Sequence, residues 1–168
     1  FTWLLVNLGT AVLASMVIGV FDATIEQMVA LAVLMPIVAS MGGNAGTQTL
    51  TITVRALATK ELTAYNALRT FRKELAVGFL NGCLFAVLAG VLTFFWFNDL
   101  ENANVLGGVI AGAMVINMVV AGFSGVALPV LLDRMKIDPA IASGVFVTTV
   151  TDVVGFLAFL GLASVTLL

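Results

Sequence analysis

The stretch VLGGVIAGAMVINMVVAGFSGVALPVLL, which runs from Val105 to Leu132, contains no charged residue. An α-helix needs about 20 apolar residues to cross the hydrocarbon core of a bilayer, and this stretch exceeds that length. Helices in the cores of soluble proteins are rarely so long and so apolar on every face. The stretch therefore predicts a transmembrane helix.

Four more segments have the same apolar character, and together they indicate the fold class. The 168-residue chain has a mean hydropathy of +1.18, and 10% of its residues are charged, against about a quarter in soluble domains. We predict an all-α membrane protein that forms one transmembrane domain over residues 1–168. The five predicted spans are residues 2–22, 27–54, 75–97, 104–132 and 139–167.

The chain begins at Phe1, without an initiator methionine, directly at the first apolar segment. This segment is too long for the core of a signal peptide, and no basic region precedes it. We therefore expect a soluble portion upstream of the first span.

All basic residues lie in two of the connections between spans. Loops rich in Lys and Arg stay in the cytoplasm, so we predict a multi-pass protein of the cell (inner) membrane with its N-terminus inside and its C-terminus outside. The connections are too short and too mixed in charge to indicate nucleic-acid binding. The basic residues are Arg55, Lys60, Arg69, Arg72 and Lys73 in one connection, and Arg134 and Lys136 in the other.

The second span combines helix-weakening and polar residues. Pro36 removes a backbone donor, and three glycines follow within residues 42–46. We expect a broken or loosened helix, which membranes tolerate only inside protein or beside water; alternatively, the glycines permit close helix packing. The polar residues in this half of the span are Asn44, Thr47, Gln48, Thr49, Thr51 and Thr53.

Asp152 lies near the middle of the fifth span, about 20 Å of helix from Pro139. A charge at this depth costs at least about 2.5 kcal/mol, and every base of the chain lies in a connection. The carboxylate is therefore protonated, exposed to water or paired with a cation that comes and goes. Gly144, Thr148 and Gly155 share its helix face, which suits the wall of a pore. A neutral, hydrogen-bonded structural aspartate is the alternative.

The available donors indicate the type of ion. Carboxylate, hydroxyl and carbonyl oxygens favour Mg²⁺, Ca²⁺ or Mn²⁺, and the chain has no histidine and only Cys83 as a softer donor. One carboxylate cannot form a dehydrated calcium cage, whereas Mg²⁺ keeps several waters and binds through one or two carboxylates. A two-fold axis beside the fifth span would bring two Asp152 side chains together. The residues thus predict a hydrated divalent cation.

Two motifs resemble the membrane domain of the MgtE family of magnesium channels. They are PIVASMGGNAGTQ at residues 36–48, followed by RALATK at 55–60, and DPAIAS at 138–143, leading to TTVTDVVG at 148–155. With five spans in the same order, the resemblance covers essentially the whole chain. It implies a homodimer with its pore on the two-fold axis, lined by the second and fifth spans.

The resemblance also implies roles for individual residues. Asp152 of each subunit would hold hydrated Mg²⁺, with Mn²⁺ or Co²⁺ as further ions, near the Thr148 backbone carbonyl. Asp138 would bind ions at the cytoplasmic mouth. Some members carry asparagine where Thr47 and Gly144 stand here. Members also carry an N-terminal cytoplasmic regulatory region with CBS domains. The predicted pore-lining residues are Gly43, Asn44, Thr47, Thr51, Gly144 and Gly155.

The sequence bears on three function classes. A passive Mg²⁺ channel accounts for Asp152 and the polar second span. A proton- or sodium-coupled divalent cation carrier, in which Asp152 exchanges a proton, is the alternative. An intramembrane enzyme is disfavoured, because aspartyl chemistry needs a second intramembrane acid, which the predicted spans do not provide, and the chain has no histidine.

Overall fold

The computed structural model describes residues 1–62 and 66–167, and every regular element in these residues is an α-helix. The predicted all-α fold is therefore confirmed. Five of the helices are long and apolar enough to cross a membrane. The helices are α1 (Thr2–Gly19), α2 (Asp22–Gln27), α3 (Ala30–Ala58), α4 (Ala67–Trp96), α5 (Ala103–Arg134) and α6 (Pro139–Thr166).

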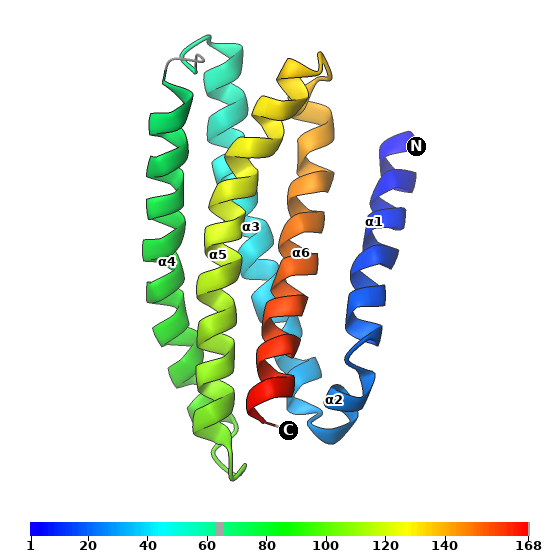
Figure 1. The fold of residues 1–168 in the computed structure, drawn as a ribbon, viewed down its shortest axis with the longest axis vertical. Coiled ribbons are helices and arrows are strands. Elements are labelled where there is room, and N and C mark those ends of the chain that lie inside the picture. Colours follow the sequence, from blue (N-terminus) through cyan, green and yellow to red (C-terminus); the bar gives the residue numbers. More distant parts are fainter. Residues whose placement is uncertain (63–65, 168) are drawn as a thin grey trace.

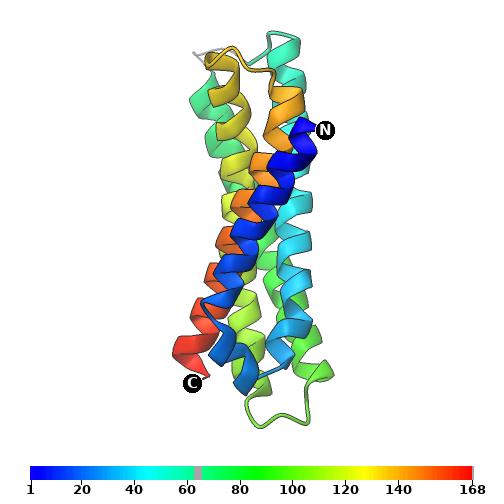
Figure 2. The same ribbon diagram turned by 90° about the vertical axis from the view of Figure 1, so that its right-hand side faces the viewer.

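Helix α5 forms the centre of the bundle, with α4, α6 and α3 packed around it (Figure 1). Its residues Leu106, Ile110 and Met114 are almost completely buried and join α3 and α6 residues in one apolar core. Helix α1 packs mainly against α6, at the edge of the bundle (Figure 2). The short α2 leads from α1 into α3 at the end opposite the N-terminus.

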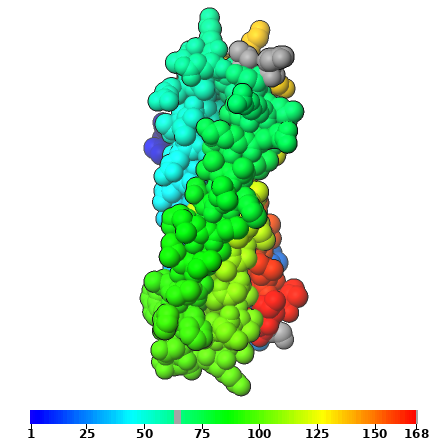
Figure 3. Space-filling view, turned by 90° about the vertical axis from the view of Figure 1, so that its left-hand side faces the viewer, coloured from blue at the N-terminus to red at the C-terminus, as the bar shows by residue number. Residues whose placement is uncertain are grey.

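Helix α4, in green, covers much of one face of the molecule (Figure 3). Large apolar side chains, among them Phe79, Leu84 and Leu88, are more than half exposed there. In a helix that spans a membrane, such residues face lipid rather than water. Helix α4 also begins at Ala67, eight residues before the predicted span, because its first two turns are polar but still helical.

The two connections that carry the basic residues lie at the same end of the bundle as the N-terminus (Figure 1). The C-terminus lies at the other end. This arrangement is the one that the charge distribution predicts for five spans. That the end with the basic residues faces the cytoplasm stays a prediction.

Helix α3 is continuous from Ala30 to Ala58, so the prediction of a broken or loosened second span is wrong. Two of the three glycines, Gly42 and Gly46, instead permit close packing, which was the alternative interpretation. A side chain at Gly42 would collide with Asn117 of α5, and one at Gly46 would come within 2.6 Å of Val147 on α6. Asn117 donates a hydrogen bond of 2.9 Å to the Val38 carbonyl, which binds α5 to α3.

Candidate cation site

Two helices, α3 and α6, bring the predicted site residues together. They pack against each other along their length, and a Cβ atom at Gly46 would lie 2.6 Å from Val147 and 3.6 Å from Thr151. Val147 and Thr151 are fully buried in this contact. The glycine thus fixes the distance and the rotation of α3 relative to α6.

The direction of the two helices places the polar residues on one side of this contact. Each residue of an α-helix is turned by about 100° from the one before it. Because α3 and α6 run in opposite directions (Figure 1), the residue after each contact residue turns toward the same side on both helices. Thr47 follows Gly46, and Asp152 follows Thr151.

We call this side the polar α3–α6 face and define it by Gly43, Thr47, Gly144, Thr148 and Asp152. Gly43 and Gly144 border open space, since a Cβ atom at either would meet nothing within 4 Å. Thr47 is exposed, and Thr148 and Asp152 are half-buried. One protomer therefore presents these residues at its surface, along one side of the bundle.

The hydroxyls of this face are turned back onto their own helices. Thr47 donates to the Gly43 carbonyl at 2.8 Å, and Thr148 donates to the Gly144 carbonyl at 3.1 Å. The Thr148 carbonyl in turn accepts a hydrogen bond of 3.0 Å from the Thr151 hydroxyl. These bonds satisfy the hydroxyl protons and leave the threonine oxygens as acceptors.

The Asp152 carboxylate has no hydrogen bond or ion pair with any residue that the structure describes. All seven basic residues lie at one end of the bundle, beyond the middle of α6 where Asp152 stands. A charge in a membrane interior requires a partner or water. No described protein group thus occupies the carboxylate, and its role as an ion ligand stays a prediction.

The other three predicted pore-lining residues differ in their exposure. Asn44 and Thr51 are exposed on α3. Gly155 is buried, and a Cβ atom there would lie 2.7 Å from the Asn117 amide nitrogen. Gly155 thus belongs to the packing contact with α5, although the helical spacing puts it only three residues from Asp152.

Asp138 has a structural role at the start of α6. It is the N-cap residue, and its Oδ1 accepts a hydrogen bond of 2.9 Å from the Ala140 amide. A cap of this type is worth about 1 kcal/mol. Asp138 lies fourteen positions before Asp152 in the chain, about 21 Å along the helix, so the two carboxylates do not form a single site.

Glu74 is a buried carboxylate that sequence reasoning assigned to a polar connection. It is 7% exposed on α4, and its Oε2 accepts a hydrogen bond of 3.3 Å from the Thr49 hydroxyl of α3. Beside it lies a cavity of about 90 Å³, lined also by Gln48 and Asn81. The sequence held one signal for this buried contact. Thr49 is a polar residue of α3 that faces away from the predicted pore, so it needs a polar partner on another helix.

No group of three or more His, Cys, Asp or Glu side chains gathers in the described residues. The polar α3–α6 face of one protomer therefore supplies a single carboxylate with nearby hydroxyl and carbonyl oxygens. These are the hard ligands that Mg²⁺ prefers, and Mg²⁺ needs only one or two carboxylates because it keeps several waters.

The fold and this face define a polytopic α-helical membrane protein with a mid-span carboxylate that has no partner among the residues described. Residues 35–162 match the family model described as MgtE, divalent cation transporter. The chain belongs to the MgtE family of divalent cation transporters. It is a multi-pass membrane protein, as the five spanning helices require.

Curated relatives agree with this assignment. The chain is 32% identical to the magnesium transporter MgtE of Bacillus subtilis over 162 residues and 34% identical to that of Thermus thermophilus over 161 residues. The Enterococcus faecalis magnesium transporter MgtE is 32% identical over 162 residues. Each match covers 96% of this chain but 35% of the relative, so the chain spans about a third of their length.

Proposed function

We propose that this chain is the membrane part of a Mg²⁺-selective channel that passes hydrated divalent cations into the cytoplasm. The observation that carries the proposal is the Asp152 carboxylate, half-buried at mid-span and without a protein partner among the described residues. A permeating cation compensates such a charge only while it is bound, which suits conduction. The names of the relatives support Mg²⁺ as the transported ion.

The pore is completed by a second copy of the chain. One protomer exposes Thr47 and half-exposes Thr148 and Asp152, an arrangement that costs free energy if it faces lipid. Pairing two polar α3–α6 faces about a two-fold axis removes this cost and gives the ion two carboxylates. Isologous contacts of this kind are the commonest in homo-oligomers.

Other parts of the proposal rest on the charge distribution and on the resemblance to the family. The end with the basic connections faces the cytoplasm, where the N-terminus also lies, and the C-terminus faces outside. An N-terminal cytoplasmic region with CBS domains would regulate the full-length protein. Asp138 attracts cations at the cytoplasmic mouth in addition to capping α6. Mn²⁺ and Co²⁺ are expected to enter by the same route.

Flux into liposomes tests the proposal. With the chain reconstituted and Mg²⁺ outside, an inside-negative potential should drive uptake, because each elementary charge gains about 2.3 kcal/mol per 100 mV. Uptake should persist when ionophores remove any proton or sodium gradient. Protein-free liposomes under the same potential provide the control.

The same measurement distinguishes the second candidate, a proton- or sodium-coupled carrier. A carboxylate without a protein partner is also suited to bind and release a proton during a transport cycle. Mg²⁺ uptake that requires a proton or sodium gradient and ignores the potential would contradict the channel and favour this carrier.

A further inference from the structure

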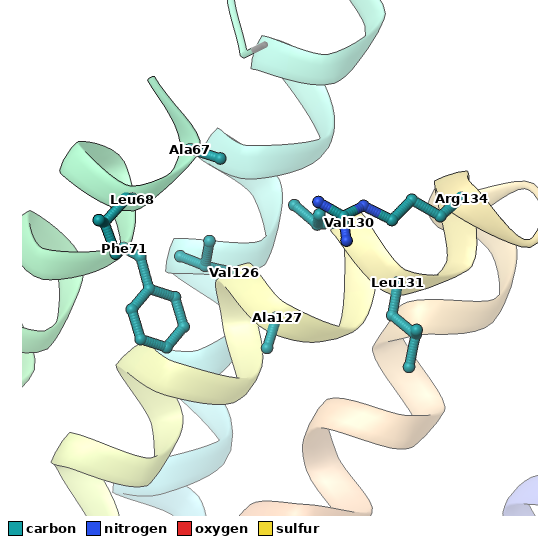
Figure 4. A pocket seen from close by; sticks show the side chains of 8 residues that line it. All are labelled: Ala67, Leu68, Phe71, Val126, Ala127, Val130, Leu131 and Arg134. Atoms are coloured by element: carbon teal, nitrogen blue, oxygen red, sulfur yellow. The ribbon is translucent and has the colours of Figure 1, made fainter. Parts of the chain in front are cut away.

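An apolar groove runs between α4 and α5 at the end of the bundle that carries the basic connections. It has a volume of about 500 Å³, and Ala67, Phe71, Ala127 and Val130 are among its lining residues. Figure 4 shows these side chains around the space between the two helices. Small residues on both helices leave this volume, and the edge-to-face contact of Phe71 with Phe123, 5.0 Å between ring centres, lies beside it.

One charged side chain borders this groove. Arg134, the last residue of α5, lines its rim, and its guanidinium lies beside Val130 rather than pointing away from the bundle (Figure 4). Arg134 forms no ion pair with any described residue. The guanidinium is planar and presents several donors, a geometry that matches phosphate oxygens.

The opposite end of the bundle offers a comparison within the same molecule. A second groove between α4 and α5, about 380 Å³ in volume, is lined by residues such as Val87, Val91 and Phe94 and by no charged residue. Lipid chains that fill this groove meet no fixed charge. The positive charge of Arg134 at its rim therefore distinguishes the groove at the basic end from the second groove.

We propose that the groove at the basic end binds an anionic phospholipid, with an acyl chain against Phe71 and Ala127 and the phosphate on Arg134. Basic pockets between transmembrane helices bind lipid head groups in this way. Arg69, Arg72 and Lys73, exposed near the start of α4, add positive charge at the same end. The bound lipid would hold α4 and α5 together where they leave the membrane. This inference is independent of the ion pathway.

Native mass spectrometry of delipidated protein tests the proposal. Phosphatidylglycerol and phosphatidylcholine with identical acyl chains are added in equal amounts, and the ratio of the retained lipids is measured. The wild-type chain should prefer phosphatidylglycerol, and Arg134→Gln should lower this preference about fivefold, as expected for loss of one basic contact. Lys136→Gln, which changes an exposed residue outside the groove, is the matched control and should preserve the preference.

A second variant tests the apolar half of the site. Ala127→Trp fills the groove while Arg134 remains, and it should reduce the retention of phosphatidylglycerol. An unchanged lipid preference in Arg134→Gln, or equal retention of both lipids by the wild-type chain, would overturn the proposal. Displacement of the lipid by inorganic phosphate alone would also overturn it, because the groove would then contribute nothing.

Discussion

Asp152→Asn is expected to abolish Mg²⁺ uptake by reconstituted protein, with a loss of at least about tenfold, equivalent to about 1.4 kcal/mol. The asparagine amide has nearly the shape of the carboxylate, so the packing of α6 should not change. It removes the negative charge that compensates for the partial dehydration of the ion. The variant should therefore fold normally and fail to conduct.

The control for this variant is Asp99→Asn. Asp99 is exposed in the connection between α4 and α5, at the end opposite the basic residues. This substitution changes the net charge of the chain by the same amount but leaves the polar α3–α6 face intact, so uptake should stay near the wild-type rate. Undiminished Mg²⁺-selective uptake by Asp152→Asn would refute the assignment of Asp152.

Gly122→Ala is expected to lower the stability of the protein. Helices α4 and α5 approach so closely at this position that a Cβ atom would lie 2.7 Å from the Glu74 carbonyl oxygen and 3.7 Å from the Gly78 Cα atom. Backbone atoms cannot rotate away, so the helices must separate. Overpacking of this kind costs about 1–3 kcal/mol, more than the roughly 1 kcal/mol that alanine gains in helix propensity.

Gly108→Ala on the same helix is the matched control. A Cβ atom at Gly108 would meet nothing within 4 Å, so only the gain in helix propensity applies. Thermal unfolding in one detergent should give a lower Tm for Gly122→Ala and an equal or higher Tm for Gly108→Ala. Equal Tm values for the two variants would contradict the close α4–α5 contact.

The sequence predicted all five spans, because apolar segments longer than the hydrocarbon thickness have few alternatives to a transmembrane helix. The ends of the spans were less predictable. Residues 67–74 contain three basic residues and one acid, yet they continue α4 as helix. Long basic side chains extend to the membrane surface while their stems lie in apolar surroundings. Charged residues therefore indicate where the membrane surface lies, but not where the helix ends.

The state of α3 could not be predicted, because it depends on a distant partner. Pro36 and the glycines lower helix propensity, and this local signal favoured a broken helix. In the structure, Asn117 fills the space beside Gly42, and Val147 fills the space beside Gly46. Tertiary packing thus outweighs helix propensity in α3. These contacts join residues far apart in the sequence, so the local sequence of α3 does not reveal them.

The candidate site was predicted in part. Asp152, Thr148 and Gly144 follow each other every four positions, so a helix places them in one row whatever surrounds it. Gly155 lies three positions after Asp152, near the same row, but α5 covers it. Glu74 was missed because a carboxylate next to basic residues resembles a solvated connection, and its burial depends on how α3, α4 and α5 meet.

Anomalous diffraction from crystals of the protein soaked in Mn²⁺ tests the central claim most directly, since this ion is visible where Mg²⁺ is not. We expect a peak on the two-fold axis between two Asp152 carboxylates, with Thr148 nearby, and no peak there in Asp152→Asn crystals. A structure in which Asp152 faces lipid, or in which the metal lies on other residues while Asp152 is free, would contradict the proposed pathway.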